Sequence, residues 1–157
     1  MGVHLQCNGR DLMSSRSGSC LCGAVTYQVE GEPLTARICW CRTCQKFSAN
    51  GTVNAIFPRA AIEPRGELSC YESPADSGNL ISRHFCGKCG TQLFANSSAF
   101  PQFRALRVGT LDEPSSIKPQ VNIWASSAPE WACLDASLKS EARQPAPPQA
   151  PIPQKGS

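Results

Sequence analysis

The sequence lacks the features of several large classes of protein. A membrane span needs about 20 consecutive apolar residues, and no segment approaches that length. Residues 1–19 are polar and contain no apolar stretch typical of a signal peptide. No block of lysine and arginine of the kind that binds nucleic acid is present. We therefore expect a cytoplasmic protein in a reducing compartment, with no nucleic-acid and no membrane partner.

The chain also lacks a Ser–His–Asp order, a phosphate-binding loop, a dinucleotide fingerprint and any long helical periodicity. Apolar residues instead alternate with polar ones in short segments that glycine and proline separate, which predicts a mainly β class. Pro119 precedes the last segment and predicts that this strand lies at a sheet edge. The expected strands are residues 25–29, 35–38, 52–57, 67–72, 80–85, 92–95, 103–108 and 121–124.

A length of 157 residues fits a single domain, which we place at residues 16–137. Residues 1–15 are polar and are expected to form a flexible N-terminal arm. Residues 138–157 contain five of the chain's thirteen prolines and are expected to form a disordered, Pro-rich tail.

Cysteine, in contrast, is abundant. Ten cysteines are present, and seven of them fall into three clusters: Cys20-Leu-Cys22, Cys39-Trp-Cys41-Arg-Thr-Cys44 and Cys86-Gly-Lys-Cys89. Such clusters belong either to disulfides of a secreted protein or to metal sites of an intracellular one. The polar N-terminus favours metal. Four thiolates close a tetrahedral zinc site and three leave one position open, so seven suggest one site of each kind.

The first and third clusters have the spacing of zinc knuckles, in which a tight glycine-containing turn aims both sulfurs at one metal. Cys20 and Cys22 supply only two ligands, and Cys86 and Cys89 supply the other two. We expect these four to form a structural zinc site whose loss unfolds the domain. The alternative is two unrelated thiol pairs or disulfides.

The second cluster places Cys39, Cys41 and Cys44 within six residues, so one loop can wrap a metal with all three. Water or a substrate sulfur would complete an open zinc site, which would be the catalytic one. A redox-active disulfide, or a purely structural site with a fourth protein ligand, are the alternatives.

Three residues beside this cluster are candidate substrate contacts. Arg42 and Lys46 are placed to attract an anionic thiol, and Trp40 is placed to cover the site. The alternatives are solvated charges for the two cations and simple packing for the tryptophan. Of the cysteines outside the clusters, Cys70 and Cys133 are expected to be small buried hydrophobic residues.

Three segments carry a resemblance to a known family: residues 18–27, the second cluster through Lys46, and residues 85–93. Together with Gly-Thr-Leu-Asp at 109–112 and Asn-Ile-Trp at 122–124, they resemble the glutathione-dependent formaldehyde-activating enzymes, also called the centromere-protein-V-like domain, over about residues 16–135. In this chain Trp40 and Asn122 stand where the family often has histidine, and Gln45-Lys46 stands where the family commonly has a basic pair.

The resemblance implies an Mss4-like fold of several coiled antiparallel β-sheets with zinc knuckles. It implies two Zn²⁺ ions per chain, a structural one on Cys20, Cys22, Cys86 and Cys89 and a labile one on Cys39, Cys41 and Cys44. The implied activity is the addition of a small thiol such as glutathione to a small aldehyde such as formaldehyde, a carbon–sulfur lyase reaction in reverse. The alternatives are a non-catalytic, zinc-stabilised protein-binding module and, less favoured, a redox repair enzyme that uses Cys133.

Overall fold

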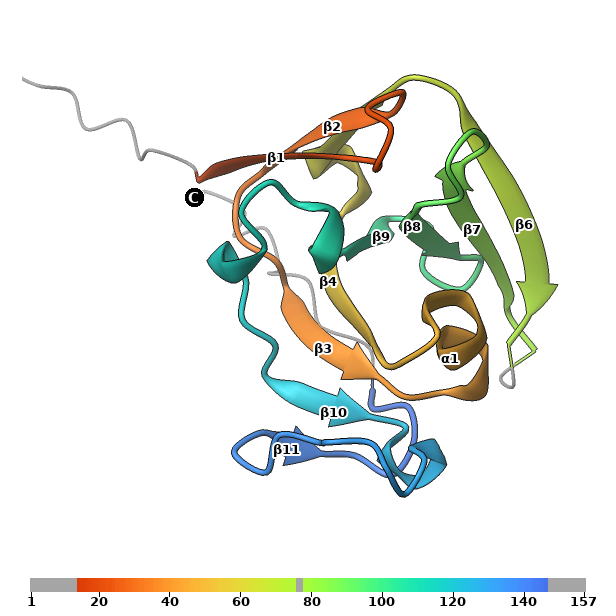
Figure 1. The fold of residues 1–157 in the computed structure, drawn as a ribbon, viewed down its shortest axis with the longest axis vertical. Coiled ribbons are helices and arrows are strands. Elements are labelled where there is room, and N and C mark those ends of the chain that lie inside the picture. Colours follow the sequence, from red (N-terminus) through yellow and green to blue (C-terminus); the bar gives the residue numbers. More distant parts are fainter. Residues whose placement is uncertain (1–13, 76–77, 147–157) are drawn as a thin grey trace, which may run out of the picture.

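The computed structural model describes residues 14–75 and 78–146, and it is mainly β (Figure 1). A small antiparallel sheet has the order β1-β2-β5, and a large mixed sheet has the order β11-β10-β3-β4-β9-β8-β7-β6. The strands are β1 (Ser15–Ser19), β2 (Thr26–Glu30), β3 (Thr35–Cys39), β4 (Thr52–Pro58), β5 (Ile62–Arg65), β6 (Leu68–Pro74), β7 (Leu80–Cys86), β8 (Gln92–Ser97), β9 (Phe103–Arg107), β10 (Val121–Ile123) and β11 (Lys139–Ser140). The helical elements are α1 (Arg42–Ser48) and the 3₁₀ turns η1 (Arg59–Ala61), η2 (Val108–Thr110), η3 (Pro114–Ser116) and η4 (Ala125–Ser127).

The mainly β class is confirmed, and eight of the strands overlap the segments expected from sequence. The edge position expected for β10 is wrong, because β10 pairs in parallel with both β3 and β11. Pro119 lies before the strand begins at Val121, so its missing N–H removes no hydrogen bond from the ladder. Within the described residues, no helix has the length and apolarity that crossing a membrane requires.

Side chains on one face of the large sheet form the core. They pack against the inward face of the small sheet, and Tyr27 meets Phe94 edge-on with ring centroids 5.2 Å apart. Each fully buried apolar side chain of this kind contributes about 1.5–3 kcal/mol relative to an exposed one. The central members of the core are Val25, Tyr27, Val29, Ala36, Ala55, Phe57, Ile62, Phe94 and Leu106.

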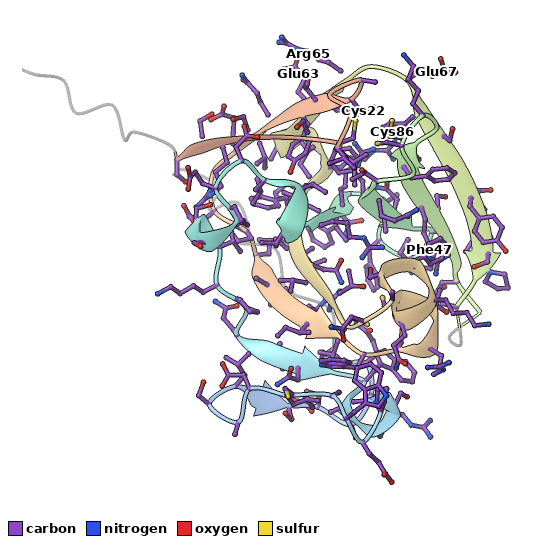
Figure 2. The ribbon with its side chains drawn as sticks, in the orientation of Figure 1. Cys22, Phe47, Glu63, Arg65, Glu67 and Cys86 are labelled. Carbon is purple, nitrogen blue, oxygen red and sulfur yellow. The ribbon has the colours of Figure 1, made fainter. Side chains whose placement is uncertain are left out.

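Helix α1 lies on the other face of the large sheet and reaches from β4 toward β6 and β7 (Figure 2). Its Phe47 ring lies 6.1 Å from the ring of Tyr71 on β6, and the Arg83 guanidinium of β7 sits 5.2 Å above it. Gln45 is buried and donates from Nε2 to the carbonyls of Trp40 at 2.6 Å and Ser127 at 2.9 Å. These contacts fix the cysteine loop that precedes the helix.

The C-terminal segment differs from expectation. The sequence assigns residues 138–146 to a disordered tail. They belong instead to the part of the chain that the structure describes, and β11 pairs with β10. Backbone hydrogen bonds hold this pairing, and the side chains of the segment do not alternate between apolar and polar. The sequence pattern therefore does not predict a strand here. At the other end, β1 begins at Ser15, the last residue of the expected arm. Residues 1–13 and 147–157 of the expected arm and tail lie outside the described residues.

Replacing Gln45 by leucine is expected to destabilise the fold by about 1–3 kcal/mol, because the buried carbonyls of Trp40 and Ser127 both lose their donor. Leucine has a similar volume, so loss of packing contributes little. Urea unfolding of the two proteins measures the difference. The matched control is Lys46→Leu on the exposed side of the same helix. A Gln45→Leu protein as stable as this control would contradict the role assigned to the glutamine.

Candidate metal centre and substrate cavity

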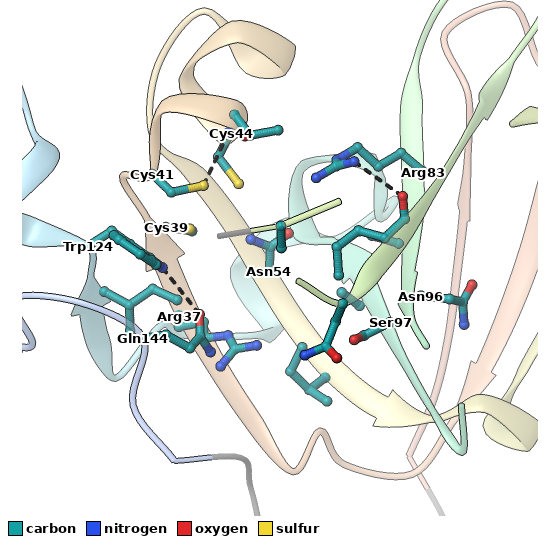
Figure 3. Close-up of a pocket in the computed structure, with 18 of the residues that line it drawn as sticks. Arg37, Cys39, Cys41, Cys44, Asn54, Arg83, Asn96, Ser97, Trp124 and Gln144 are labelled. Atoms are coloured by element: carbon teal, nitrogen blue, oxygen red, sulfur yellow. Dashed lines mark hydrogen bonds between the residues drawn. The ribbon is translucent and has the colours of Figure 1, made fainter. Parts of the chain in front are cut away.

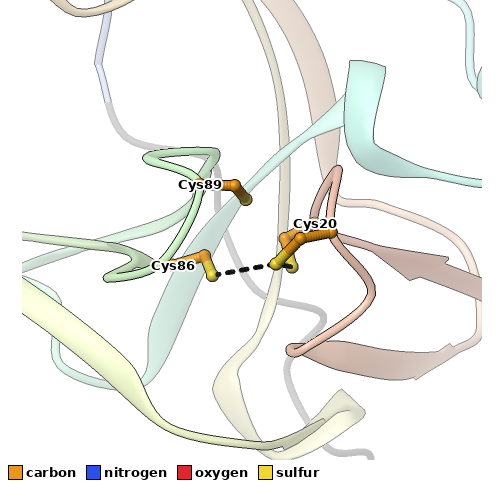
Figure 4. A group of neighbouring side chains, drawn as sticks. Cys20, Cys86 and Cys89 are labelled. Carbon is orange, nitrogen blue, oxygen red and sulfur yellow. Dashed lines mark hydrogen bonds between the residues drawn. The ribbon is translucent and has the colours of Figure 1, made fainter.

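Four cysteines from distant parts of the chain meet at one point. The Sγ atoms of Cys20, Cys22, Cys86 and Cys89 all lie within 4.8 Å of one another. The Cys20–Cys22 sulfurs are 3.6 Å apart and the Cys22–Cys86 sulfurs 3.7 Å apart (Figure 4). Sulfurs at the corners of a tetrahedron with zinc–sulfur bonds of about 2.3 Å would be about 3.8 Å apart. The arrangement therefore fits a tetrahedral metal ion.

Backbone and side-chain donors surround these sulfurs, as in zinc knuckles. The Val25 N–H lies 3.2 Å from Cys20 Sγ, and the Thr91 hydroxyl 3.2 Å from Cys89 Sγ. Hydrogen bonds from Thr91 lower the pKa of Cys89 to about 5, which favours the thiolate that binds metal. Gly23 and Gly90, one after each pair, both have φ of 75°, which confirms the glycine turns expected from sequence.

The second group lies on the opposite face of the large sheet. The Sγ atoms of Cys39, Cys41 and Cys44 also lie within 4.8 Å of one another. Cys39 ends β3 and is buried, whereas Cys41 and Cys44 are half-buried in the loop and first turn of α1. Within residues 14–75 and 78–146, no histidine, aspartate, glutamate or further cysteine joins them. Three soft donors with an accessible side can hold a zinc ion that keeps a position for another ligand.

Of the three thiols, Cys44 is the one whose thiolate form is favoured. Hydrogen bonds from Cys39 and Cys41 lower the pKa of Cys44 to about 2, and the nearby Arg107 charge adds to the effect. The same hydrogen bonds raise the pKa of Cys39, which acts as a donor to its neighbours. The amide N–H of Cys44 also points at Cys41 Sγ, at 3.4 Å. This environment stabilises the thiolate form of Cys44 before any metal is considered.

A cavity of about 490 Å³ opens beside this cysteine group (Figure 3). This volume lies in the range typical of small-molecule sites. The three thiols lie at one side of it, and alternate residues of the central strands form the floor. Four arginines line it, and the described part of the chain contributes no aspartate or glutamate to its wall. The lining residues that matter here are Arg37, Cys39, Cys41, Arg42, Cys44, Asn54, Arg83, Arg107, Trp124 and Gln144.

Two of these arginines are held rigidly. Arg83 donates to Ser73 Oγ at 2.8 Å and to the Ile81 carbonyl, and it is also stacked on Phe47. Arg107 is 8% exposed and donates to Asn54 Oδ1, while its buried Nε has no hydrogen-bond partner. No described carboxylate forms an ion pair with either arginine.

Burial lowers the pKa of Arg107 and of Arg37, and the charges of Cys39 and Cys44 oppose this effect. Desolvated guanidinium groups are stable only beside negative charge. The cavity is therefore built to receive anions.

Of the three residues expected to contact substrate, one lines the cavity and two do not. Arg42 lines the cavity and donates to Gln45 Oε1. Lys46 is exposed and does not line the cavity. Trp40 is also outside the lining. Its ring packs against Gly51, where a Cβ atom would come within 2.9 Å of it, and its Nε1 donates to Asn122 Oδ1 at 3.4 Å. Trp40 thus has the packing position that the sequence left open as an alternative.

Arg37, Arg83 and Arg107 were not expected from the sequence as site residues. The usable signal is strand alternation, because Arg37 lies two positions before Cys39 on β3 and so shares its face. Arg83 and Arg107 lie inside β7 and β9, opposite Ala95 of β8 and Asn54 of β4. Nothing local to either residue identifies which face will carry the cavity.

The cysteines outside the clusters correct an expectation. Cys70 and Cys133 are exposed rather than buried. Cys70 lies on β6, the edge strand of the large sheet, where one flank has no neighbouring strand. Cys133 follows the exposed Trp131 in an irregular segment and does not line the cavity. Cys7 lies outside the described residues.

The sequence model of the glutathione-dependent formaldehyde-activating enzyme family matches residues 15–127. A curated protein of Halomonas elongata that carries the same enzyme name as a provisional assignment is 26% identical over 128 residues, covering 76% of this chain and 80% of that protein. A crystal structure of a Rhodobacter sphaeroides protein shares the fold, with a TM-score of 0.51 and 24% identity over 66% of this chain and 91% of that one. The chain therefore belongs to the glutathione-dependent formaldehyde-activating enzyme family.

Proposed function

We propose that this protein is a zinc-dependent enzyme of the carbon–sulfur lyase type. It would add a small anionic thiol such as glutathione to a small aldehyde such as formaldehyde, or catalyse the reverse. In the forward direction the thiol loses its proton, the sulfur forms a bond to the carbonyl carbon, and the carbonyl oxygen takes up a proton. No oxidant or reductant is needed. The reducing cytoplasm, where free thiols persist, is the compartment that suits this chemistry.

The observation that carries the proposal is the position of the Cys39–Cys41–Cys44 group at the side of a cavity that four arginines line. A purely structural metal site is closed by four protein ligands, whereas no fourth described ligand approaches this group. A zinc ion held there would keep a substrate thiol ionised at neutral pH. The family match supports glutathione and formaldehyde as the substrates.

Charge balance supports an anionic substrate. Three thiolates and one Zn²⁺ carry a net charge of −1, and a fourth thiolate would make it −2. Arg37 and Arg107, whose charges interact with Cys39 and Cys44, offset this accumulation. Arg83 is fixed by its bonds to Ser73 and Ile81, so it can receive a carboxylate with little loss of side-chain entropy. Glutathione carries two carboxylates besides its thiol, and both need cationic partners in such a cavity.

The two cysteine groups are expected to differ in what their metal does. Elemental analysis of the purified protein should find two zinc ions per chain. Cys44→Ser should retain about one zinc and nearly the full thermal stability, because this group lies beside the cavity rather than in the core. Cys86→Ser should lose the other zinc and most of the stability, because metal binding there ties β1 to the β7–β8 turn.

Cys70→Ser is the matched control, since Cys70 is exposed and belongs to neither group. It should change neither zinc content nor thermal stability. Retention of both zinc ions by Cys44→Ser would refute the assignment of the second site.

Exchange between glutathione and its formaldehyde adduct, followed by NMR, tests the activity. The wild type should exceed the uncatalysed rate, and Cys41→Ser should fall to it. Arg83→Gln should raise KM for glutathione by about 10- to 100-fold, the loss expected of one charge-assisted hydrogen bond. With uncharged 2-mercaptoethanol the same variant should match the wild type.

Arg65→Gln is the control for loss of positive charge, because Arg65 lies on β5 beside Glu63 at the surface and away from the cavity (Figure 2). It should leave both KM values unchanged. A wild type with no rate above the uncatalysed one, for either thiol, would reject the enzyme. The zinc-stabilised protein-binding module would then be the better explanation of the fold.

A further inference from the structure

The segment that follows the family match returns to the cavity. The match ends at residue 127, and β11 begins twelve positions later at Lys139. From there the backbone runs along β10 and η4. Glu141 donates to the Asn122 carbonyl at 2.8 Å, Ala125 donates to the Glu141 carbonyl at 3.0 Å, and Ser126 Oγ donates to the Ala142 carbonyl at 2.6 Å. These bonds attach the segment to η4 and to β10, the strand that lies beside Cys39 on β3.

The attached segment delivers Gln144 and Pro145 to the cavity wall. The Trp124 amide donates to the Arg143 carbonyl at 3.3 Å, and the Trp124 indole Nε1 donates to Gln144 Oε1 at 3.3 Å. Gln144 is therefore oriented by a residue that itself lines the cavity. Figure 3 shows both side chains beside Arg37, on the same side of the cavity as Cys39.

Trp124 adopts a left-handed backbone conformation, with φ of 57° and ψ of 34°. Residues other than glycine and asparagine rarely do so, and such strain concentrates at ligand-binding sites. The strained residue here is the one that holds Gln144. This is a second sign, separate from the cavity itself, that the position is under functional constraint.

The bond to Trp124 uses the oxygen of the Gln144 amide, which leaves the Nε2 group as a donor. Among the described residues, no acceptor bonds to this Nε2. An amide donor and the Arg37 guanidinium together suit a carboxylate or a peptide carbonyl, because both offer oxygen lone pairs in one plane.

We propose that Gln144 and Pro145 are part of the substrate-binding site and that Gln144, together with Arg37, binds the non-reacting end of the thiol. This inference rests on the proposed function. It makes the segment beyond the family match a specificity determinant, which distinguishes thiols that carry a carboxylate or an amide from short thiols that lack one.

The test uses S-methylglutathione, which keeps both carboxylates and both peptide groups but has no ionisable thiol. Its binding to the full-length zinc protein is measured by calorimetry. Gln144→Ala should weaken this binding about 10-fold, as expected for one lost hydrogen bond. In the exchange assay the same variant should raise KM for glutathione by a similar factor, leave kcat unchanged and leave the kinetics with 2-mercaptoethanol unchanged.

Trp124→Phe removes the indole N–H while keeping most of the ring, and it should reproduce part of the loss. Gln28→Ala, on the exposed face of β2, is the matched control and should bind like the wild type. Equal binding of S-methylglutathione by Gln144→Ala and the wild type would overturn this inference and leave the proposed enzyme standing. A wild type that neither binds this probe nor exchanges the adduct would overturn both.

Discussion

Neighbouring side chains on β3, β4 and β9 point to opposite faces of the large sheet, and this geometric rule separates the core from the cavity. On one face Ala36, Ala55 and Leu106 join the core. On the other, Arg37, Asn54 and Arg107 meet the cysteine group. A shift of register by one residue would place guanidinium groups in the core and apolar groups at the thiols. The register of three adjacent strands is therefore a condition for both stability and binding.

The two cysteine groups use this separation for different purposes. The four-cysteine group joins the small sheet to the large one, and two of its members, Cys20 and Cys86, are core residues. The three-cysteine group lies on the cavity side, where Cys41 and Cys44 are only half-buried. Because the groups lie on opposite faces, the chemistry at one can change without loss of the contacts around the other. The group that joins the two sheets and the group that faces the cavity are thus separate sets of thiols.

The metal-ligand candidates could be predicted from sequence because their spacing is local, as in Cys86-Gly-Lys-Cys89. Most strands were also predictable, since alternation is a property of a few adjacent residues. Helix α1 was missed because seven residues span only two turns and show no periodicity. The arginines of the cavity were missed because their role depends on which strands become neighbours: Arg107 of β9 meets Asn54 of β4 across 53 positions of sequence. The order of residues 138–146 was missed because β11 pairs through backbone atoms, which leave no pattern in the side chains. The prolines nearby indicate disorder instead.

The left-handed backbone at Trp124 has an evolutionary consequence. An ordinary side chain in this conformation costs about 1–2 kcal/mol relative to one in the right-handed region, and glycine would avoid that cost. A mutation to glycine would therefore relieve strain and at the same time remove the indole that orients Gln144. The backbone conformation and the contact with Gln144 thus favour different residues at this one position. Retention of tryptophan in a lineage would then record selection for the contact with Gln144, because the backbone conformation alone favours glycine.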